Sequence, residues 1–341
     1  MVSGGRLPDT QQLAVDTRER GFAGITFTET GRTAYLSVAA AALAAPELTY
    51  STGVAVAFPR SPMVTASTAW ELADLTDGHF LLGLGTQVRA HIERRYSSEF
   101  EHPGPRLRDY VEAVRAIFRA FQGTAPLAYR GEFYRHELLP AMWSPGPIAH
   151  PDIPIYVSAV GPWMVRMAGE VADGVHVHPL HSRRYLDEML LPGVAAGAAK
   201  AGRDVRSVAL AVPVFTVVGD SAEERAPWRA LARSQIAFYG STRNYAFQFD
   251  LLGFEGTSAR LNERLKAGDP TGMAELISDE MLAELTVESS WDELADRLID
   301  RYDGTASRLI LYFADAMRHR DPDAFARLGR VAREVMDRTV L

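Results

Sequence analysis

Short apolar runs alternate along the chain with longer stretches in which apolar residues recur at helical spacing. The runs predict eight strands, at residues 3–7, 24–27, 48–57, 80–83, 155–159, 174–177, 208–218 and 308–313. The helical spacing predicts helices between them, most clearly at residues 107–121, 291–302 and 325–335. Pro62 and Pro105 suit first helical turns, and Ser290, with Glu293 three residues later, suits a helix N-cap.

Strands that are apolar on both faces, each followed by a helix, are typical of a parallel sheet covered by helices. Eight of them favour an α/β fold closed into a (β/α)₈ TIM barrel over an open, doubly wound sheet. We expect one domain over residues 1–341, without repeats or linkers. Three stretches do not fit the repeat, at about 86–104, 125–150 and 240–288. We expect these insertions at the C-terminal face, where barrel active sites are built and where long loops serve as lids.

Composition narrows the function. The formal net charge of −7 argues against a nucleic-acid partner, which requires a basic surface. The sequence contains no cysteine, so disulfides, thiolate metal sites and cysteine nucleophiles are excluded. The longest apolar stretch, residues 35–45, is too short to cross a bilayer, and the N-terminal residues lack a signal-peptide core. We therefore expect a soluble, cytoplasmic protein that acts on a small molecule.

Several motifs carry a resemblance to a known family. The run from Thr52 to Pro62 (TGVAVAFPRSP) resembles the third strand of the bacterial luciferase-like superfamily, and Leu82–Gln87 (LGLGTQ) its fourth. Further matches are Tyr156–Pro162 (YVSAVGP) and Gly169–Gly174 (GEVADG), similar to its fifth-strand loop and to the lead into strand six. Together with residues 91–95 and 236–242, they resemble the actinobacterial branch that uses the deazaflavin coenzyme F420. The resemblance runs from about residue 21 to residue 313.

The resemblance implies where a cofactor ring would lie. At the position of Gly53 and Val54, the family has a non-proline cis peptide, in a bulge that presses on the ring. Taken without the resemblance, Gly53 is more simply explained by relief of crowding in a buried strand.

Two glycine-bearing strand ends suit a phosphate. The loop Ser158, Ala159, Val160 and Gly161 leaves a strand and enters a helix at Pro162, so free N–H groups and the helix dipole face an anion. Gly85, Thr86 and Gln87 form a second such turn, although either loop alone is also an ordinary turn. His91 and Arg95 share a helical face that would attract the acidic tail of F420, or simply be solvated.

The group that handles the proton is less defined. Relatives in the superfamily that oxidise sugar phosphates or alcohols have an acidic residue followed by a histidine base. Glu29 matches the acid, but Thr30 replaces the histidine, and threonine does not accept a proton near neutral pH. His178 is the substitute that we predict, with His176 beside it, and either is also compatible with a structural role. The residues expected in the substrate pocket are Thr30, Trp143, His176 and Tyr239.

The sequence thus predicts an F420-dependent oxidoreductase that transfers a hydride to or from a small organic substrate. An FMN-dependent luciferase-like monooxygenase is the alternative. A metal-dependent barrel hydrolase, using His176 and His178, would need further ligands at other strand ends. A cofactor-binding protein without turnover also remains open. The resemblance further implies a homodimer.

Overall fold

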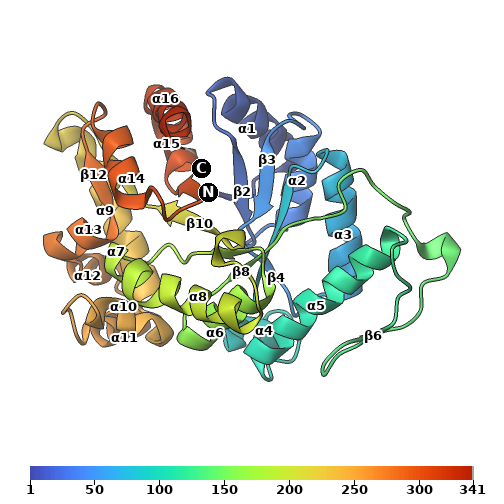
Figure 1. Cartoon of the computed structure of the whole chain (residues 1–341). Coiled ribbons are helices and arrows are strands. Elements are labelled where there is room, and N and C mark those ends of the chain that lie inside the picture. The colour runs from blue at the N-terminus through green and yellow to red at the C-terminus, as the bar shows by residue number, and fades with distance from the viewer. Residues whose placement is uncertain (340–341) are drawn as a thin grey trace. The chain divides into compact units, whose positions relative to one another are not determined.

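A computed structural model describes residues 1–339. The chain packs as two compact units (Figure 1). The first comprises residues 1–159, 163–176 and 194–209, and the second comprises residues 160–162, 177–193 and everything described from Leu210 onward.

A parallel sheet with buried strands forms the centre of the first unit. Its strands lie in the order β1-β2-β3-β5-β8-β9, so that neighbours in the sheet follow one another along the chain. Their bounds are Val2–Ser3, Gly24–Thr28, Thr49–Thr52, Phe80–Gly85, Ile155–Ser158 and Gly174–His176. The helices that follow these strands, or precede the next, are α1 (Leu7–Glu19), α2 (Ala34–Ala42), α3 (Pro62–Leu75), α4 (Arg89–Arg94), α5 (Pro103–Phe121), α6 (Pro162–Val171) and α8 (Leu191–Lys200).

The third strand is interrupted in this unit. Ser51 of β3 lies opposite Leu81, whereas Ala55 of β4 (Ala55–Val56) lies opposite Leu84. Four residue steps on one strand therefore match three on its neighbour, which defines a β-bulge at residues 52–54. The continuous strand predicted over residues 48–57 was wrong at this point.

The segment between α5 and β8 contains a short hairpin, β6 (Tyr129–Arg130) and β7 (Arg135–His136), and the turn η1 (Ala141–Trp143). The hairpin lies against the beginning of α5, because Asp109 accepts hydrogen bonds from the N–H groups of Phe133 and Tyr134. The end of the segment lies at Asp77, whose carboxylate contacts His150 at 3.2 Å.

The second unit has two parallel strand pairs. β10 (Ala209–Val214) pairs with β13 (Arg308–Leu311), and β11 (Thr216–Val218) pairs with β12 (Val287–Ser289). The single strand predicted over residues 208–218 is thus divided at Phe215. The helical elements of the second unit are α7 (Arg183–Tyr185), a π-helical turn (Leu186–Leu190), α9 (Ala222–Gly240), η4 (Arg243–Tyr245), α10 (Ala246–Asp250), α11 (Thr257–Lys266), α12 (Pro270–Glu275), α13 (Asp279–Leu285), α14 (Leu294–Tyr302), α15 (Ala314–Arg320) and α16 (Pro322–Arg338).

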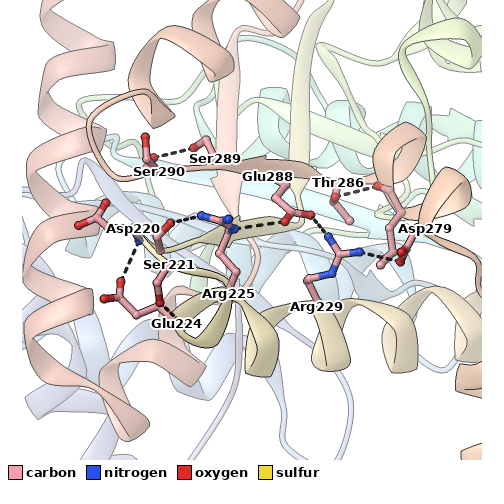
Figure 2. Close-up of polar contacts among 12 residues, drawn as sticks. Asp220, Ser221, Glu224, Arg225, Arg229, Asp279, Thr286, Glu288, Ser289 and Ser290 are labelled. Carbon is pink, nitrogen blue, oxygen red and sulfur yellow. Dashed lines mark hydrogen bonds and ion pairs between the residues drawn. The ribbon is translucent and has the colours of Figure 1, made fainter.

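A row of arginines attaches the predicted insertion at 240–288 to α9. Figure 2 shows Arg225 and Arg229 pointing to Glu288 of β12, with N–O distances of 3.3 and 2.5 Å. Arg229 also contacts Asp279, the first residue of α13, at 2.6 Å. Charge pairs therefore hold the C-terminal part of this insertion, from α13 to β12, against α9.

The repeated strand–helix order and the parallel pairing confirm the predicted α/β TIM-barrel class. Two further local predictions were wrong. Residues 3–7 are mostly not strand, because α1 begins at Leu7. Ser290 is not an N-cap, because α14 begins only at Leu294, after a turn. Within residues 1–339, no helix has the length and apolar character that crossing a membrane requires.

Candidate functional site

The bulge in the third strand is built around Gly53. The peptide bond between Gly53 and Val54 is cis, as the resemblance implied. A Cβ atom at position 53 would lie 2.3 Å from Cγ2 of Thr26 and 2.5 Å from Nε2 of His176. No side chain larger than hydrogen fits there, so His176, which is buried at the end of β9, packs directly on the backbone of the bulge.

Side chains replace the ladder bonds that the bulge disrupts. The hydroxyl of Thr52 accepts the N–H of Gly83 at 2.9 Å and donates to the carbonyl of the same residue at 2.7 Å. The next residue, Val54, is only half-buried, and its Cγ2 would lie 2.5 Å from a Cβ at Gly85. Glycine at position 85 therefore lets Val54 sit across the end of β5.

Glu29 fixes the other side of the bulge. Its carboxylate forms a two-point ion pair with Arg60, at 2.5 and 2.9 Å, and accepts the N–H of Val56 at 2.7 Å. The Glu29 side chain is 4% exposed, and the Arg60 guanidinium lies over the ring of Tyr35. Both oxygens are thus engaged with the segment that follows the bulge. A direct action of Glu29 on cofactor or substrate stays a prediction.

The two glycine-bearing strand ends lie on neighbouring strands. Leu84 of β5 is opposite Val157 of β8, so Gly85 and Ser158 leave the same edge of the sheet side by side. The side-chain oxygen of Gln87 accepts the N–H of Val88 at 2.9 Å. The side chain of Gln87 is therefore engaged within its own turn.

The second of these strand ends continues through Ala159 and Val160 into Gly161, directly before α6 begins at Pro162. No atom lies within 4 Å of the place where a Cβ of Gly161 would stand. A small anionic group can therefore approach the backbone there, where the first N–H groups of a helix are available.

The basic residues on and next to α4 differ in their contacts within the chain. Arg89 is paired with Glu93 and Glu101 on the surface. Arg95 donates to the carbonyl oxygen of Thr30, next to Glu29 in the chain. His91 is exposed on α4. The structure thus brings Arg95 and Thr30 together and leaves the role of His91 in binding a prediction.

In the second unit, His178 lies between two tyrosine rings. The ring centroids of Tyr239 and Tyr245 are 4.8 and 4.3 Å from that of His178. The Nδ1 atom of His178 accepts the N–H of Leu180 at 3.1 Å. An acceptor at Nδ1 places the proton of the neutral ring on Nε2, so this imidazole is held as a hydrogen-bond donor at that atom.

Tyr239 also has a partner that sequence reasoning missed. Its hydroxyl lies 2.6 Å from that of Tyr312, which follows the last residue of β13. Burial raises the pKa of both phenols above the usual value, so both stay protonated at neutral pH. The signal that could have found Tyr312 is its place at the carboxyl end of a barrel strand.

The His176–His178 segment does not form a metal centre in the described chain. His181, the third histidine nearby, is buried and bonds through Nδ1 to the carbonyl of His178 at 2.9 Å. Burial lowers its pKa to about 4. Residues 1–339 contain no group of three or more histidine or acidic side chains placed to hold a metal ion. The further ligands that the hydrolase alternative requires are not found among these residues.

Trp143 is strongly exposed. Its side chain is 74% exposed in η1, beside Met142, which is 88% exposed. It is therefore not a core aromatic, and its role as a pocket wall stays a prediction.

Comparison with known proteins places this geometry in a family. The family described as luciferase-like monooxygenase matches residues 1–308. The chain belongs to the luciferase-like monooxygenase family. It is accordingly an oxidoreductase, as the sequence predicted.

Members of this luciferase-like family and solved structures extend the comparison. An uncharacterized protein of Mycobacterium tuberculosis is 37% identical over 311 residues, which cover 91% of this chain and 92% of that protein. The 5,10-methylenetetrahydromethanopterin reductase of Archaeoglobus fulgidus is 28% identical over 271 residues, 78% of this chain and 77% of the reductase. The structure of the coenzyme F420-dependent tetrahydromethanopterin reductase from Methanopyrus kandleri matches with a TM-score of 0.75 at 17% identity, over 91% of this chain and 90% of the other, which shows a shared fold.

Proposed function

We propose that this luciferase-like oxidoreductase binds the deazaflavin coenzyme F420 and transfers a hydride between it and a small organic substrate. The observation that carries the proposal is the bulge at Gly53 and Val54 beside the glycine-bearing ends of β5 and β8. Val54 is half-buried, so its side chain can meet a flat ring, and Gly85 and Gly161 place no side chain at or just after the neighbouring strand ends.

Each part of the coenzyme has residues suited to hold it. Val54 would support the ring from one side. The N–H groups of the loops at Gly85–Thr86 and Ser158–Gly161 would bind the phosphate. His91 lies on the helix that follows the first of these loops, and Arg95 is the C-cap of that helix. When bound, the coenzyme supplies a hydride donor or acceptor. Glu29 would act through Arg60 and Val56, by keeping the bulge in place.

The choice of F420 over FMN is supported by the relatives rather than by the bulge. The Methanopyrus kandleri structure is titled as coenzyme F420-dependent, and the Archaeoglobus fulgidus relative is the corresponding reductase. The name of the family, luciferase-like monooxygenase, favours a flavin-dependent oxygenase as the second candidate.

Equilibrium titration distinguishes the two. Purified protein is titrated with F420, followed by the fluorescence of the deazaflavin, and separately with FMN. We expect saturable binding of F420 that is at least tenfold tighter than that of FMN. Tight binding of FMN alone would contradict the assignment of F420 and would favour a flavin-dependent monooxygenase. Binding of neither would remove redox catalysis by this site.

A further inference from the structure

A groove in the second unit lies between α9 and α12, and we call it the α9 groove. Its volume is about 860 Å³, which is within the range of ligand-binding pockets. Small side chains make this room, because Ala230 and Ser234 lie one turn apart on α9 and Ala274 lies on α12. Residues 277–280, which lead into α13, complete the wall.

Arg233 lines the α9 groove with a guanidinium that is already engaged. Its Nε–H donates to the carbonyl of Ile277 at 3.0 Å, and the guanidinium pairs with Asp279. Asp279 also contacts Arg229 at 2.6 Å (Figure 2). These bonds fix one wall of the groove, and the charge of Arg233 is balanced by Asp279 rather than offered to an anionic ligand.

Two carboxylates of the α9 groove are placed differently. Glu275 at the end of α12 and Glu280 in the first turn of α13 are exposed. Within residues 1–339, neither forms an ion pair. The hydroxyl of Ser278 holds the pKa of Glu280 below its ordinary value, so that carboxylate is charged at neutral pH. The groove thus presents negative charge that the described chain does not neutralise.

The face of α9 that borders the groove continues to Phe238. Ala230, Ser234 and Phe238 are spaced four residues apart and therefore lie along one face of the helix. The distance between two packed helices depends on the side chains at their contact, so the small residues of this face let another helix come close. Phe238 is 58% exposed and offers that helix an apolar contact.

The rim of the α9 groove favours a polypeptide over a small molecule. Ser234, Thr271, Glu275 and Glu280 are all exposed, so much of the groove faces solvent. A small ligand there would keep a large part of its surface in water, whereas small-molecule pockets bury most of their ligand. A helix from another protein covers the groove and its rim together.

We propose that the α9 groove docks a basic amphipathic helix of a partner protein. The apolar face of that helix packs on Ala230, Ser234 and Phe238, in the helix-in-groove mode of recognition. Its lysine or arginine side chains lie opposite Glu275 and Glu280. Charge complementarity of this kind sets the orientation and the rate of association, and it rejects acidic partners. The proposal is independent of the coenzyme.

Fluorescence anisotropy tests the charge of the α9 groove. The probe is a labelled peptide of leucine, alanine and lysine, with its leucines on one helical face and about 18 residues long so that it forms a helix. We expect saturable binding to the wild type and at least tenfold weaker binding to the double variant Glu275→Lys/Glu280→Lys. The control Glu255→Lys/Glu263→Lys changes two exposed acids outside the groove and the net charge equally, and should bind as the wild type does. Equal losses in the two double variants, or no binding by the wild type, would overturn the proposal.

Hydrogen exchange with the same peptide tests where it binds. We expect slower exchange in residues 226–238 and 270–282 when the peptide is present. Ser234→Trp fills the groove from an exposed position, so it should keep the wild-type melting temperature and bind the peptide at least tenfold more weakly. Protection confined to other parts of the chain, or full affinity in Ser234→Trp, would contradict docking in the groove.

Two other occupants give different results. A second copy of the chain in the groove would make the wild type a dimer that Ser234→Trp dissociates, as measured by sedimentation velocity. A small polyamine in the groove would give saturable calorimetric binding of spermine that Glu275→Lys/Glu280→Lys abolishes. We expect equal sedimentation of the wild type and Ser234→Trp, and no such binding of spermine. Either of the other two results would replace the partner helix and overturn the proposal.

Discussion

The carboxylate of Glu29 and the guanidinium of Arg60 form a two-point ion pair, and the same carboxylate accepts the N–H of Val56. Because Val56 lies two residues after the bulge, the pair links the end of β2 to the backbone that would support a cofactor ring. An ion pair with one partner almost fully buried is costly to break, because the remaining charge loses its compensation.

Glu29→Ala should therefore affect stability and cofactor binding together. We expect a loss of about 3 kcal/mol in the free energy of unfolding, measured by urea denaturation. Affinity for F420 should fall at least tenfold. Arg89→Ala removes a surface pair with Glu93 and should leave the free energy of unfolding nearly unchanged. Equal losses of unfolding free energy in the two variants would show that the Glu29–Arg60 pair stabilises the fold no more than a surface ion pair does.

Gly53→Ala tests how closely the bulge is packed. The added methyl group would meet Thr26 and His176 at distances that no Cβ tolerates, so we expect destabilisation by about 1–3 kcal/mol. Thr26→Ser removes the contacting methyl group and should restore part of the loss in the double variant. Gly31→Ala, which has open space at the Cβ position, is the control and should be nearly neutral. A thermal melt of Gly53→Ala that matches the wild type would contradict the packing described for the bulge.

Gly161→Asp and Gly161→Asn separate charge from size in the loop before α6. Either side chain extends into open space, so both variants should fold with wild-type melting temperatures. A carboxylate would repel the phosphate of the coenzyme, and we expect Gly161→Asp to bind F420 at least 100-fold more weakly, with Gly161→Asn much less affected. Fluorescence titration measures both. Similar affinities in the two variants would place the phosphate elsewhere.

His181 predicts a pH dependence of stability. Burial lowers its pKa to about 4 in the folded chain from an ordinary value of 6.5, so below pH 6.5 the unfolded chain binds the proton more readily. Stability should thus fall as the pH drops from about 6.5 towards 4, with a contribution of about 3 kcal/mol from this group. His181→Gln should flatten the urea-derived stability profile in that window. A profile as steep as that of the wild type would assign the dependence to other groups.

Much of the fold follows from sequence periodicity, because strands buried on both faces and amphipathic helices have distinct patterns. The ends of β2, β5 and β8 were predicted within two residues. The same patterns fail where backbone geometry changes within one apolar run. Residues 48–57 are apolar enough for one strand, yet Gly53 marks a bulge, and the run through Phe215 contributes to two sheets.

The candidate site was predicted in part. Gly85 at the end of β5 has a local cause, because a Cβ there would meet Val54, whereas Gly161 after β8 has open space at its Cβ position. Arg60 and Tyr312 were missed, because their roles depend on partners 31 and 73 residues away along the chain. His178 lies beyond the strand predicted over residues 174–177, since β9 ends at His176.

A crystal structure of the chain with F420 tests the central claim most directly. We predict that the deazaflavin ring lies in van der Waals contact with Val54, with its phosphate within hydrogen-bonding distance of the N–H groups of Gly85–Thr86 or Ser158–Gly161. Electron density for the coenzyme at any other part of the molecule, with the bulge at Gly53 uncovered, would contradict it.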